Sequence, residues 1–251
     1  MREILIIVFS LILFIFYGCS TTKNNVNKVK YHSLGNYYQS EEIYKALKMN
    51  LKAQSIVRNN ILNNNTIAFK KNKVFFMSPC DMEIQREYSQ GNFIKTSGKC
   101  DIFINGKGFL RVKMYDSYLY TRNGRLKINS RGKLITLHGF KLFPEITIPD
   151  SSNIKNVRIG YDGTVIACYK DGKNKVVAEL LLCKFENVQE LSLVGDGYYK
   201  TTESPSEGLP GSEGLGTIKF GGLEASNVDV AQEKIELMRL TNYYKTIASL
   251  I

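Results

Sequence analysis

The sequence predicts a mixed α and β fold, in which an antiparallel β meander (a small barrel-like or sandwich-like domain) is flanked by a helix at each end. Apolar residues recur at helical spacing in residues 41–62 and again in residues 229–251. Between them, residues 101–200 alternate apolar and polar side chains, and glycine-containing turns interrupt the alternation at short intervals. With 43% hydrophobic residues, the chain can build a core.

The first residues have the features of a secretion signal. The largely apolar run from Ile4 to Tyr17 is shorter than the roughly 20 residues that a membrane-spanning helix needs. It suits the apolar region of a signal peptide. Gly18 and Cys19 follow it and resemble the lipobox of bacterial lipoproteins, in which the cysteine is diacylated. We therefore expect a signal peptide at residues 1–18 and a lipid on Cys19. A plain cleaved signal and an uncleaved anchor are the alternatives.

Residues 19–37 predict a flexible tether, because they are polar and have no apolar periodicity. Ten Lys and Arg residues but only two Glu residues lie between Thr21 and Lys73, so most of the net charge of +11 is found there. This charge could favour an anionic lipid surface or could simply be solvated. Nothing resembles a recognition helix or an aromatic stacking platform, so we expect no nucleic acid partner.

The first predicted helix lies within residues 38–70. Ser40 is a good N-cap, and Glu41 and Glu42 follow it in the first turn, where the helix dipole favours acidic side chains. The asparagine-rich run at residues 59–66 ends the helix, because its side chains compete for backbone hydrogen bonds. The apolar residues form two stripes, so we expect more than one neighbour. The stripes are Ile43, Leu47 and Leu51, and Met49, Ala53, Ile56 and Val57.

A linker at residues 71–100 leads to the central β domain at residues 101–203. Leu110, Val112 and Met114 alternate with basic residues, as do Leu126 and Ile128. The Asn123-Gly124 pair between these two runs predicts a β-hairpin, because type I′ turns need φ > 0 at both central positions. Further turns are predicted at Arg131-Gly132, His138-Gly139, Asp162-Gly163 and Asp171-Gly172.

A Gly/Pro loop at residues 204–226 precedes the C-terminal helix at residues 227–251. Asp229 and Gln232 predict a capping box at its start. Its apolar residues step three and four apart, as the a and d positions of a coiled coil do. This seam either docks on the chain's own β domain or pairs with another helix, for which the first helix is a natural partner. It consists of Leu237, Leu240, Tyr244, Ile247 and Ile251.

No residues predict catalysis, a cofactor or a metal site. The chain has two histidines, no Cys-x-x-Cys pair and no phosphate-binding loop. With Cys19 lipidated, four cysteines remain. Cys80 and Cys100 could close a disulfide loop, whereas Cys183 lies in an apolar run typical of a buried strand.

Taken together and in order, a set of motifs resembles the flagellar basal-body rod and hook protein family over about residues 40–251. No single motif is specific, but the ordered set is. It includes Asn59-Asn60-Ile61-Leu62-Asn63-Asn64-Asn65-Thr66-Ile67-Ala68-Phe69-Lys70, Gln90-Gly91-Asn92-Phe93, Tyr120-Thr121-Arg122-Asn123-Gly124-Arg125-Leu126, Ile159-Gly160-Tyr161-Asp162-Gly163-Thr164-Val165 and Gly221-Gly222-Leu223-Glu224-Ala225-Ser226-Asn227-Val228-Asp229.

The resemblance implies a structural subunit of the rod, self-assembling through paired terminal helices, with other rod and hook proteins as partners. It places the chain in the basal body within the cell envelope, the periplasm, and Cys19 implies a membrane tether. The alternatives are a lipid-anchored accessory that binds the rod without polymerising, and a surface lipoprotein whose β domain binds an unrelated ligand. The residues implied in assembly are Asn60, Asn63, Asn65, Thr66, Phe69, Lys70, Ser226, Asn227, Val228, Leu237, Leu240 and Tyr244.

The chain departs from the family pattern in its N-terminal extension, residues 1–36, because members normally leave the cell without a cleaved signal. The segment between Lys71 and Cys100 is also short for the family. Ala68 stands where the family has a glycine.

Overall fold

The computed structural model describes residues 30–249, and their side chains from residue 41 on. The chain divides into two compact units, residues 1–43 and residues 44–251. The signal peptide, Cys19 and Ile251 lie outside the described residues.

Two α-helices lie near the ends of the described chain: α2 (Lys30–Leu62) and α3 (Val230–Ala248). The prediction that Ser40 caps the first helix is wrong, because α2 begins ten residues earlier and Ser40 lies inside it. An interior serine costs only about 0.5 kcal/mol relative to alanine, so it does not stop a helix that neighbouring residues continue. The residues expected to form the tether therefore include the first turns of α2.

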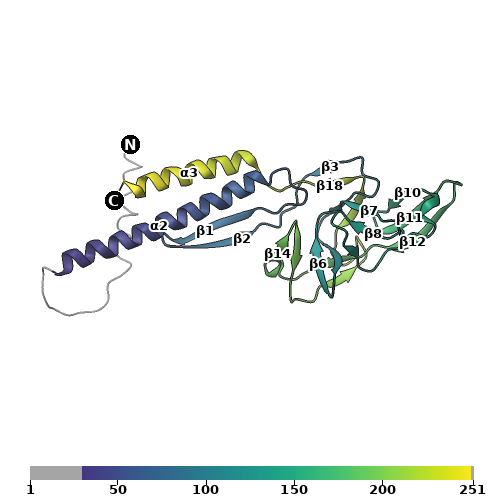
Figure 1. Cartoon of the computed structure of the whole chain (residues 1–251), viewed down its shortest axis with the longest axis horizontal. Helices are drawn as coiled ribbons and strands as arrows, with labels where there is room; N and C mark the ends of the chain where they lie inside the picture. Colours follow the sequence, from purple (N-terminus) through teal and green to yellow (C-terminus); the bar gives the residue numbers. More distant parts are fainter. Residues whose placement is uncertain (1–29, 250–251) are drawn as a thin grey trace. The chain divides into compact units, whose positions relative to one another are not determined.

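Helices α2 and α3 pack side by side and run antiparallel, and a β-hairpin lies against them (Figure 1). The hairpin consists of β1 (Asn72–Ser78) and β2 (Asp81–Arg86), which fall in the expected linker. Ala53, Val57 and Leu240 are buried where the three elements meet. Partly buried apolar side chains from all three elements pack around them, namely Ile61, Leu237, Val74 and Met82.

The remaining strands form small antiparallel sheets and one larger sheet. The seven-stranded sheet has the order β14-β15-β6-β5-β9-β8-β7 and stays open, with β14 and β7 at its edges, so it does not close into a barrel. Its strands are β5 (Leu110–Met114), β6 (Ser117–Thr121), β7 (Leu126–Ile128), β8 (Leu134–Thr136), β9 (Lys141–Leu142), β14 (Ser192–Gly195) and β15 (Tyr198–Lys200).

A three-stranded sheet contains β10 (Ile154–Ile159), β11 (Thr164–Tyr169) and β12 (Asn174–Glu179). Three further pairs join strands distant in the sequence: β13 (Leu182–Lys184) with β16 (Ser206–Gly208), β17 (Thr217–Phe220) with β4 (Ile102–Asn105), and β18 (Gly222–Glu224) with β3 (Phe93–Lys95). Short 3₁₀ turns cover Ser151–Asn153 and Val188–Glu190. The mixed α and β fold with an antiparallel β-rich domain is thereby confirmed.

The alternating residues build the main core. Leu110, Val112 and Leu126 are buried as predicted, together with residues of the three-stranded sheet such as Val157 and Val165. The predicted turns at Gly132, Gly139, Gly163 and Gly172 are all present. Each of these glycines has φ between 74° and 89°, a conformation that costs other residues about 1–2 kcal/mol.

The prediction of a hairpin at Asn123-Gly124 is wrong. The two strands that flank this pair, β6 and β7, do not pair with each other: β6 pairs with β5 and β15, and β7 pairs with β8. Gly124 is needed for a different reason. Its carbonyl accepts a hydrogen bond from the Ile102 amide at 3.0 Å, and a Cβ there would lie 1.9 Å from the Ile102 carbonyl oxygen. The Asn123 side chain accepts from the Arg125 amide at 3.1 Å and turns the chain locally.

The expected loop between Cys80 and Cys100 does not form a disulfide, because Cys100 carries a free, buried thiol. Burial raises the pKa of Cys100 to about 11 and that of Cys183 to about 12. Both groups are therefore almost entirely neutral thiols near neutral pH, and a neutral thiol is a poor nucleophile.

We expect iodoacetamide at pH 8 to leave Cys100 and Cys183 unmodified in the folded protein, since both are buried and lack the thiolate. Cys168, which is half-buried, serves as the control and should react faster. Peptide mapping by mass spectrometry reads each cysteine separately, and denaturant should make all of them reactive. Rapid modification of Cys183 by iodoacetamide in the folded protein would contradict its buried position.

Candidate assembly site

The C-terminal helix is fixed at its start by a side-chain cap. Asp229 accepts hydrogen bonds from the amides of Ala231 at 2.9 Å and Gln232 at 3.2 Å, as the sequence predicted. Further along α3, Leu237 and Leu240 of the predicted seam face α2. These two residues therefore pack within the chain, in one apolar cluster with Ala53 and Val57, as the second alternative anticipated.

The face of α2 that α3 covers is more polar than its sequence suggested. Asn50 and Gln54 are both buried there, and the Gln54 amide donates to Asn50 at 2.7 Å. Arg58 in turn donates to the Gln54 side-chain oxygen at 3.1 Å. Leu51, expected in the first apolar stripe, is instead half-exposed. The pairing of the two helices thus rests on few large apolar side chains.

Asn60, near the end of α2, joins three elements. Its side-chain amide donates to the Glu233 carboxylate on α3 at 3.0 Å and to the Asn72 carbonyl at 2.8 Å. Its side-chain oxygen accepts from the Asn72 amide at 3.0 Å. Glu233 also pairs with Lys71 at 3.1 Å. This polar cluster of Asn60, Lys71, Asn72 and Glu233, which we call the helix clamp, ties α2 to both α3 and the start of β1.

The asparagine-rich segment ends α2 by capping its last carbonyls. The Asn63 side chain donates to the Asn59 carbonyl at 2.9 Å and accepts from the Thr66 hydroxyl at 3.0 Å. Asn65 and Thr66 are exposed, and Phe69 is half-buried. Ala68 adopts a left-handed φ of 57°, which explains why the family pattern has a glycine at this position.

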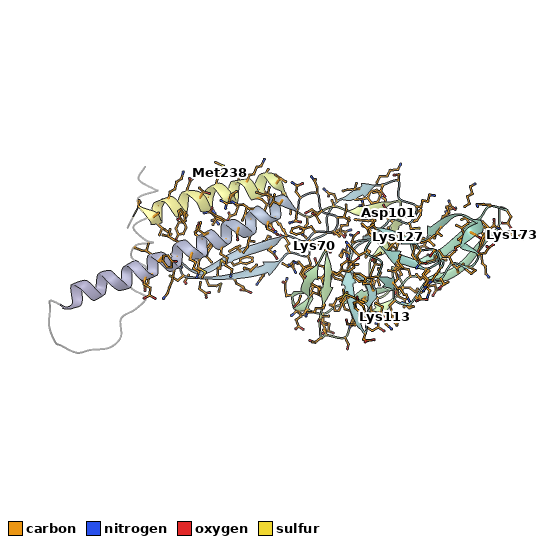
Figure 2. The ribbon with its side chains drawn as sticks, viewed as in Figure 1. Lys70, Asp101, Lys113, Lys127, Lys173 and Met238 are labelled. Carbon is orange, nitrogen blue, oxygen red and sulfur yellow. The ribbon has the colours of Figure 1, made fainter. Side chains whose placement is uncertain are left out.

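Lys70 enters a second polar cluster, where the chain passes from the helices to the β-rich part (Figure 2). Its ammonium lies 2.5 Å from Glu224 and also donates to the Ser89 carbonyl at 2.6 Å. The other Glu224 oxygen accepts from Arg122 at 2.7 Å. The side chains of Lys70 and Glu224 are completely buried and that of Arg122 nearly so. We call Lys70, Arg122 and Glu224 the buried triad.

The electrostatics of the triad follow from its burial. Burial lowers the pKa of the Lys70 ammonium, while the adjacent Glu224 carboxylate opposes that shift. Arg122 satisfies its remaining donors on the carbonyls of Ile104, Gly106 and Gly108, at 2.7–2.8 Å. The cluster is therefore almost fully hydrogen-bonded, as a buried ionic group must be.

The segment before α3 is also tied to the N-terminal half of the chain. The Asn227 side chain accepts from the Lys71 amide at 2.8 Å and donates to the Glu87 carbonyl at 2.7 Å. The Ser226 hydroxyl accepts from the Val228 amide at 3.3 Å. These contacts place Asn60, Lys70 and Asn227, three of the implied assembly residues, in bonds within the chain.

Sequence reasoning missed the partners of these residues: Arg122, Glu224 and Glu233. A signal was present for Glu224, because it stands between Leu223 and Ala225 at the end of a short apolar strand. A charge in such a position is buried only when it is paired. Nothing in the sequence indicated which distant cations would pair with it.

Away from the clamp, the helices expose apolar side chains. On α3, Ile235 and Met238 are 67% and 66% exposed and lie on the side opposite Leu237 and Leu240. On α2, Tyr44, Leu51 and Leu62 are exposed. Large exposed apolar residues grouped on one part of a protein are typical of interaction surfaces.

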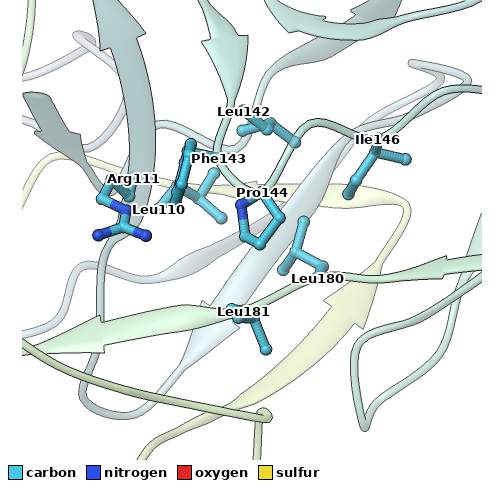
Figure 3. Close-up of a pocket in the computed structure, with 8 residues that line it drawn as sticks. All are labelled: Leu110, Arg111, Leu142, Phe143, Pro144, Ile146, Leu180 and Leu181. Atoms are coloured by element: carbon cyan, nitrogen blue, oxygen red, sulfur yellow. The ribbon is translucent and has the colours of Figure 1, made fainter. Parts of the chain in front are cut away.

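On the described β-rich part, an open surface hollow of about 610 Å³ lies beside β5 and β9 and is lined by residues that include Lys113, Tyr115, His138, Phe140 and Glu145. A small pocket beside Pro144 is lined by apolar side chains and Arg111, and it is too small for a water molecule (Figure 3). Among the described residues, no group of three or more His, Cys, Asp or Glu side chains could hold a metal ion. Neither helix, as far as it is described, is long and apolar enough to cross a membrane.

Comparison with known proteins gives consistent matches. The model of the Flagellar hook protein FlgE/F/G D1 domain matches residues 103–167. The flagellar basal-body rod protein FlgG of Buchnera aphidicola subsp. Baizongia pistaciae is 32% identical over 241 residues, which cover 81% of this chain and 92% of that protein.

Two further relatives carry the same description. Flagellar basal-body rod protein FlgG of Buchnera aphidicola subsp. Acyrthosiphon pisum is 37% identical over 167 residues, or 64% of this chain and 63% of the relative. Its counterpart from Borreliella burgdorferi is 32% identical over 167 residues, with the same shares covered.

Replacing Asn60 with alanine should destabilise the protein by about 1–3 kcal/mol, because Glu233 and Asn72 would lose buried hydrogen bonds. The neighbouring Asn59→Ala is the matched control, since the Asn59 side chain is exposed and should change stability by less than about 0.5 kcal/mol. Urea denaturation followed by circular dichroism measures both. Equal effects of the two substitutions would show that the clamp does not stabilise the helix pair.

Proposed function

This chain belongs to the flagellar basal-body rod protein family, and we propose that it is a structural subunit of the rod that self-assembles through its paired terminal helices. The observation that carries the proposal is the exposed apolar row on α3, Ile235 and Met238, beside a helix pair already closed on its other side. A helix pair with uncovered apolar faces is stabilised by further helices. We propose no catalytic role.

The implied assembly residues divide into two groups on this view. Asn60, Lys70, Asn227, Leu237 and Leu240 act within the subunit, since their contacts hold the two helices together and hold them to the β-rich part. Asn65 and Thr66 are exposed just after α2, where a neighbouring subunit could reach them. A head-to-tail contact whose rotation does not close into a ring produces a helical polymer, which is the assembly we propose.

We further propose that the chain is tethered to a membrane by a lipid on Cys19 and works in the periplasm. The support is the order of an apolar run, Gly18 and Cys19 at the start of the sequence. A tethered subunit would be held close to the site where it is built in. Other rod and hook proteins are the expected partners, together with further copies of this chain.

The assembly proposal predicts that Ile235→Glu combined with Met238→Glu removes the chain from the rod without unfolding it. Both side chains are exposed, so the monomer loses little, whereas a subunit interface would bury two unpaired carboxylates. The measurement is the ratio of this chain to other rod proteins in basal bodies washed with detergent and salt, by quantitative mass spectrometry. The unmodified chain should stay at a fixed ratio.

A matched control is Leu193→Glu combined with Val194→Glu on the edge strand β14. These residues are 45% and 49% exposed and receive the same change of charge, but they lie outside the helices. This variant should be retained. Loss of the unmodified chain in the detergent wash would instead identify a lipid-anchored accessory, and full retention of the α3 variant would exclude that face as an interface.

Replacing Cys19 with alanine should release the chain from the membrane fraction and abolish any lipid mass on it, because the thioether to the lipid cannot form. Membrane fractionation and intact-mass measurement test this directly. Ser20→Ala is the control, as the adjacent side chain would carry no lipid. Unchanged mass and fractionation in Cys19→Ala would exclude the lipid anchor.

A further inference from the structure

We propose that Glu224 is a positioning residue, whose buried carboxylate fixes the orientation of the terminal-helix pair on the β-rich part and thereby makes the subunit competent to assemble. The inference rests on the proposed function for its last step only. The orientation itself is a property of the monomer and can be measured without the rod.

A single carboxylate holds three separate segments. One Glu224 oxygen accepts from the Lys70 ammonium at 2.5 Å and from the Gly91 amide at 3.0 Å. The other oxygen accepts from the Arg122 guanidinium at 2.7 Å. Lys70 follows α2, Gly91 precedes β3, and Arg122 follows β6, so the carboxylate lies where the helix side and the β side of the molecule meet.

Hydrogen bonds and close packing also fix the main chain on either side of this carboxylate. The Ala68 amide donates to the Glu224 carbonyl at 2.8 Å, and the Ala225 amide donates to the Asn92 carbonyl at 2.8 Å. Gly91 approaches so closely that a Cβ there would lie 2.0 Å from the Ala225 carbonyl oxygen. Arg122 is in turn held by three carbonyls of residues 104–108, which belong to the β-rich part.

The helix clamp and the buried triad have separate tasks. The clamp, through Asn60, Lys71 and Glu233, joins α2 to α3 and to β1. It contains no residue from β3 to β18. The triad, by contrast, joins Lys70, in the segment between α2 and β1, to the ends of β6 and β18. Loss of Glu224 should therefore free the helix pair from the β-rich part while leaving the two helices together.

Charge explains why this position requires a carboxylate. Lys70 and Arg122 are both cationic, and Glu224 is the carboxylate that pairs with each of them where they are buried. Buried ionic groups contribute little net stability compared with apolar side chains of similar size, but their bonds are directional. Apolar replacement of all three would keep the packing and lose the directional bonds, which separates orientation from stability.

The test uses the full chain, purified in detergent, with Cys19, Cys80 and Cys168 replaced by serine so that introduced cysteines take the spin labels. One label pair, at Met238→Cys and Lys173→Cys, spans the helices and the β-rich part, and both positions are exposed (Figure 2). A second pair, at Met238→Cys and Leu51→Cys, lies within the helix pair. Pulsed electron spin resonance gives the distance distribution for each pair.

Glu224→Gln should broaden the distribution between positions 238 and 173, leave the distribution between positions 238 and 51 narrow, and abolish retention in washed basal bodies. Gln keeps the size of the side chain but removes its charge. Unchanged width between positions 238 and 173, or retention at the ratio of the unmodified chain, would overturn the proposal.

The triple variant Lys70→Met, Arg122→Met, Glu224→Leu addresses the case in which Glu224→Gln does not fold. It should fold, because no buried charge is left unpaired, yet its distance distribution between positions 238 and 173 should stay broad and it should be absent from basal bodies. A narrow distribution with normal retention would show that the charges merely stabilise, and would overturn the proposal. If the unmodified chain itself is not retained, the proposed function fails, while the label distances still decide the role of Glu224.

Discussion

Two buried carboxylates determine how the ends of this chain meet. Lys70, Lys71 and Arg122 are withdrawn from water, and an uncompensated charge in that position costs several kcal/mol. Glu224 pairs with Lys70 and Arg122, and Glu233 pairs with Lys71; both carboxylates come from the C-terminal part of the chain, and Glu87 lies 3.9 Å from Lys71 as a third. The end of α2 and the start of α3 are therefore held beside the same short stretch, residues 70–72, by a requirement of electrostatics as much as by apolar contact.

Apolar burial between the helices is modest by comparison. The contact contains Ala53, Val57 and Leu240 as its fully buried apolar residues, and Asn50 and Gln54 lie on the covered face of α2. The side-chain amide nitrogen of Asn50 has no hydrogen-bond partner among the described residues. Such a face specifies a geometry better than it provides stability, which is how buried polar residues act in coiled coils. Stability comes chiefly from the core of the β-rich part.

The sequence predicted what depends on local chemistry. The Asp229 cap, the turn glycines and the alternation of Leu110 and Val112 all follow from backbone preferences and from the period of two in a strand. The hairpin prediction at Asn123-Gly124 was wrong because a glycine can serve either a turn with positive φ or a close approach between two segments of backbone. Here the missing Cβ permits close approach to Ile102, and no turn of positive φ is made. The start of α2 was misplaced because a good cap residue also fits inside a helix.

Pairings between distant residues were beyond sequence reasoning. Asn60 and Lys70 were identified as important through family resemblance, but their partners lie 173 and 154 residues away. The hairpin of β1 and β2 falls in the expected linker, and Phe75, Phe76 and Met77 in β1 break the alternation typical of a half-buried strand. The two uses of the α3 seam were both compatible with its spacing, and the contact of Leu240 with α2 decided between them.

The closure of β3 on β18 and of β4 on β17 has a consequence for the order of folding. A ribosome makes the first strand of each pair long before the second, so residues 93–105 wait without partners while the rest of the β-rich part is synthesised. Contacts so far apart in sequence carry a large entropic cost and form late. A chain interrupted before residue 217 would lack both closing strands, the carboxylate of Glu224 and the whole of α3. The fold can therefore be completed only after residues 217–248 have been synthesised. Partly synthesised chains are excluded from any assembly that requires α2 and α3 to be paired.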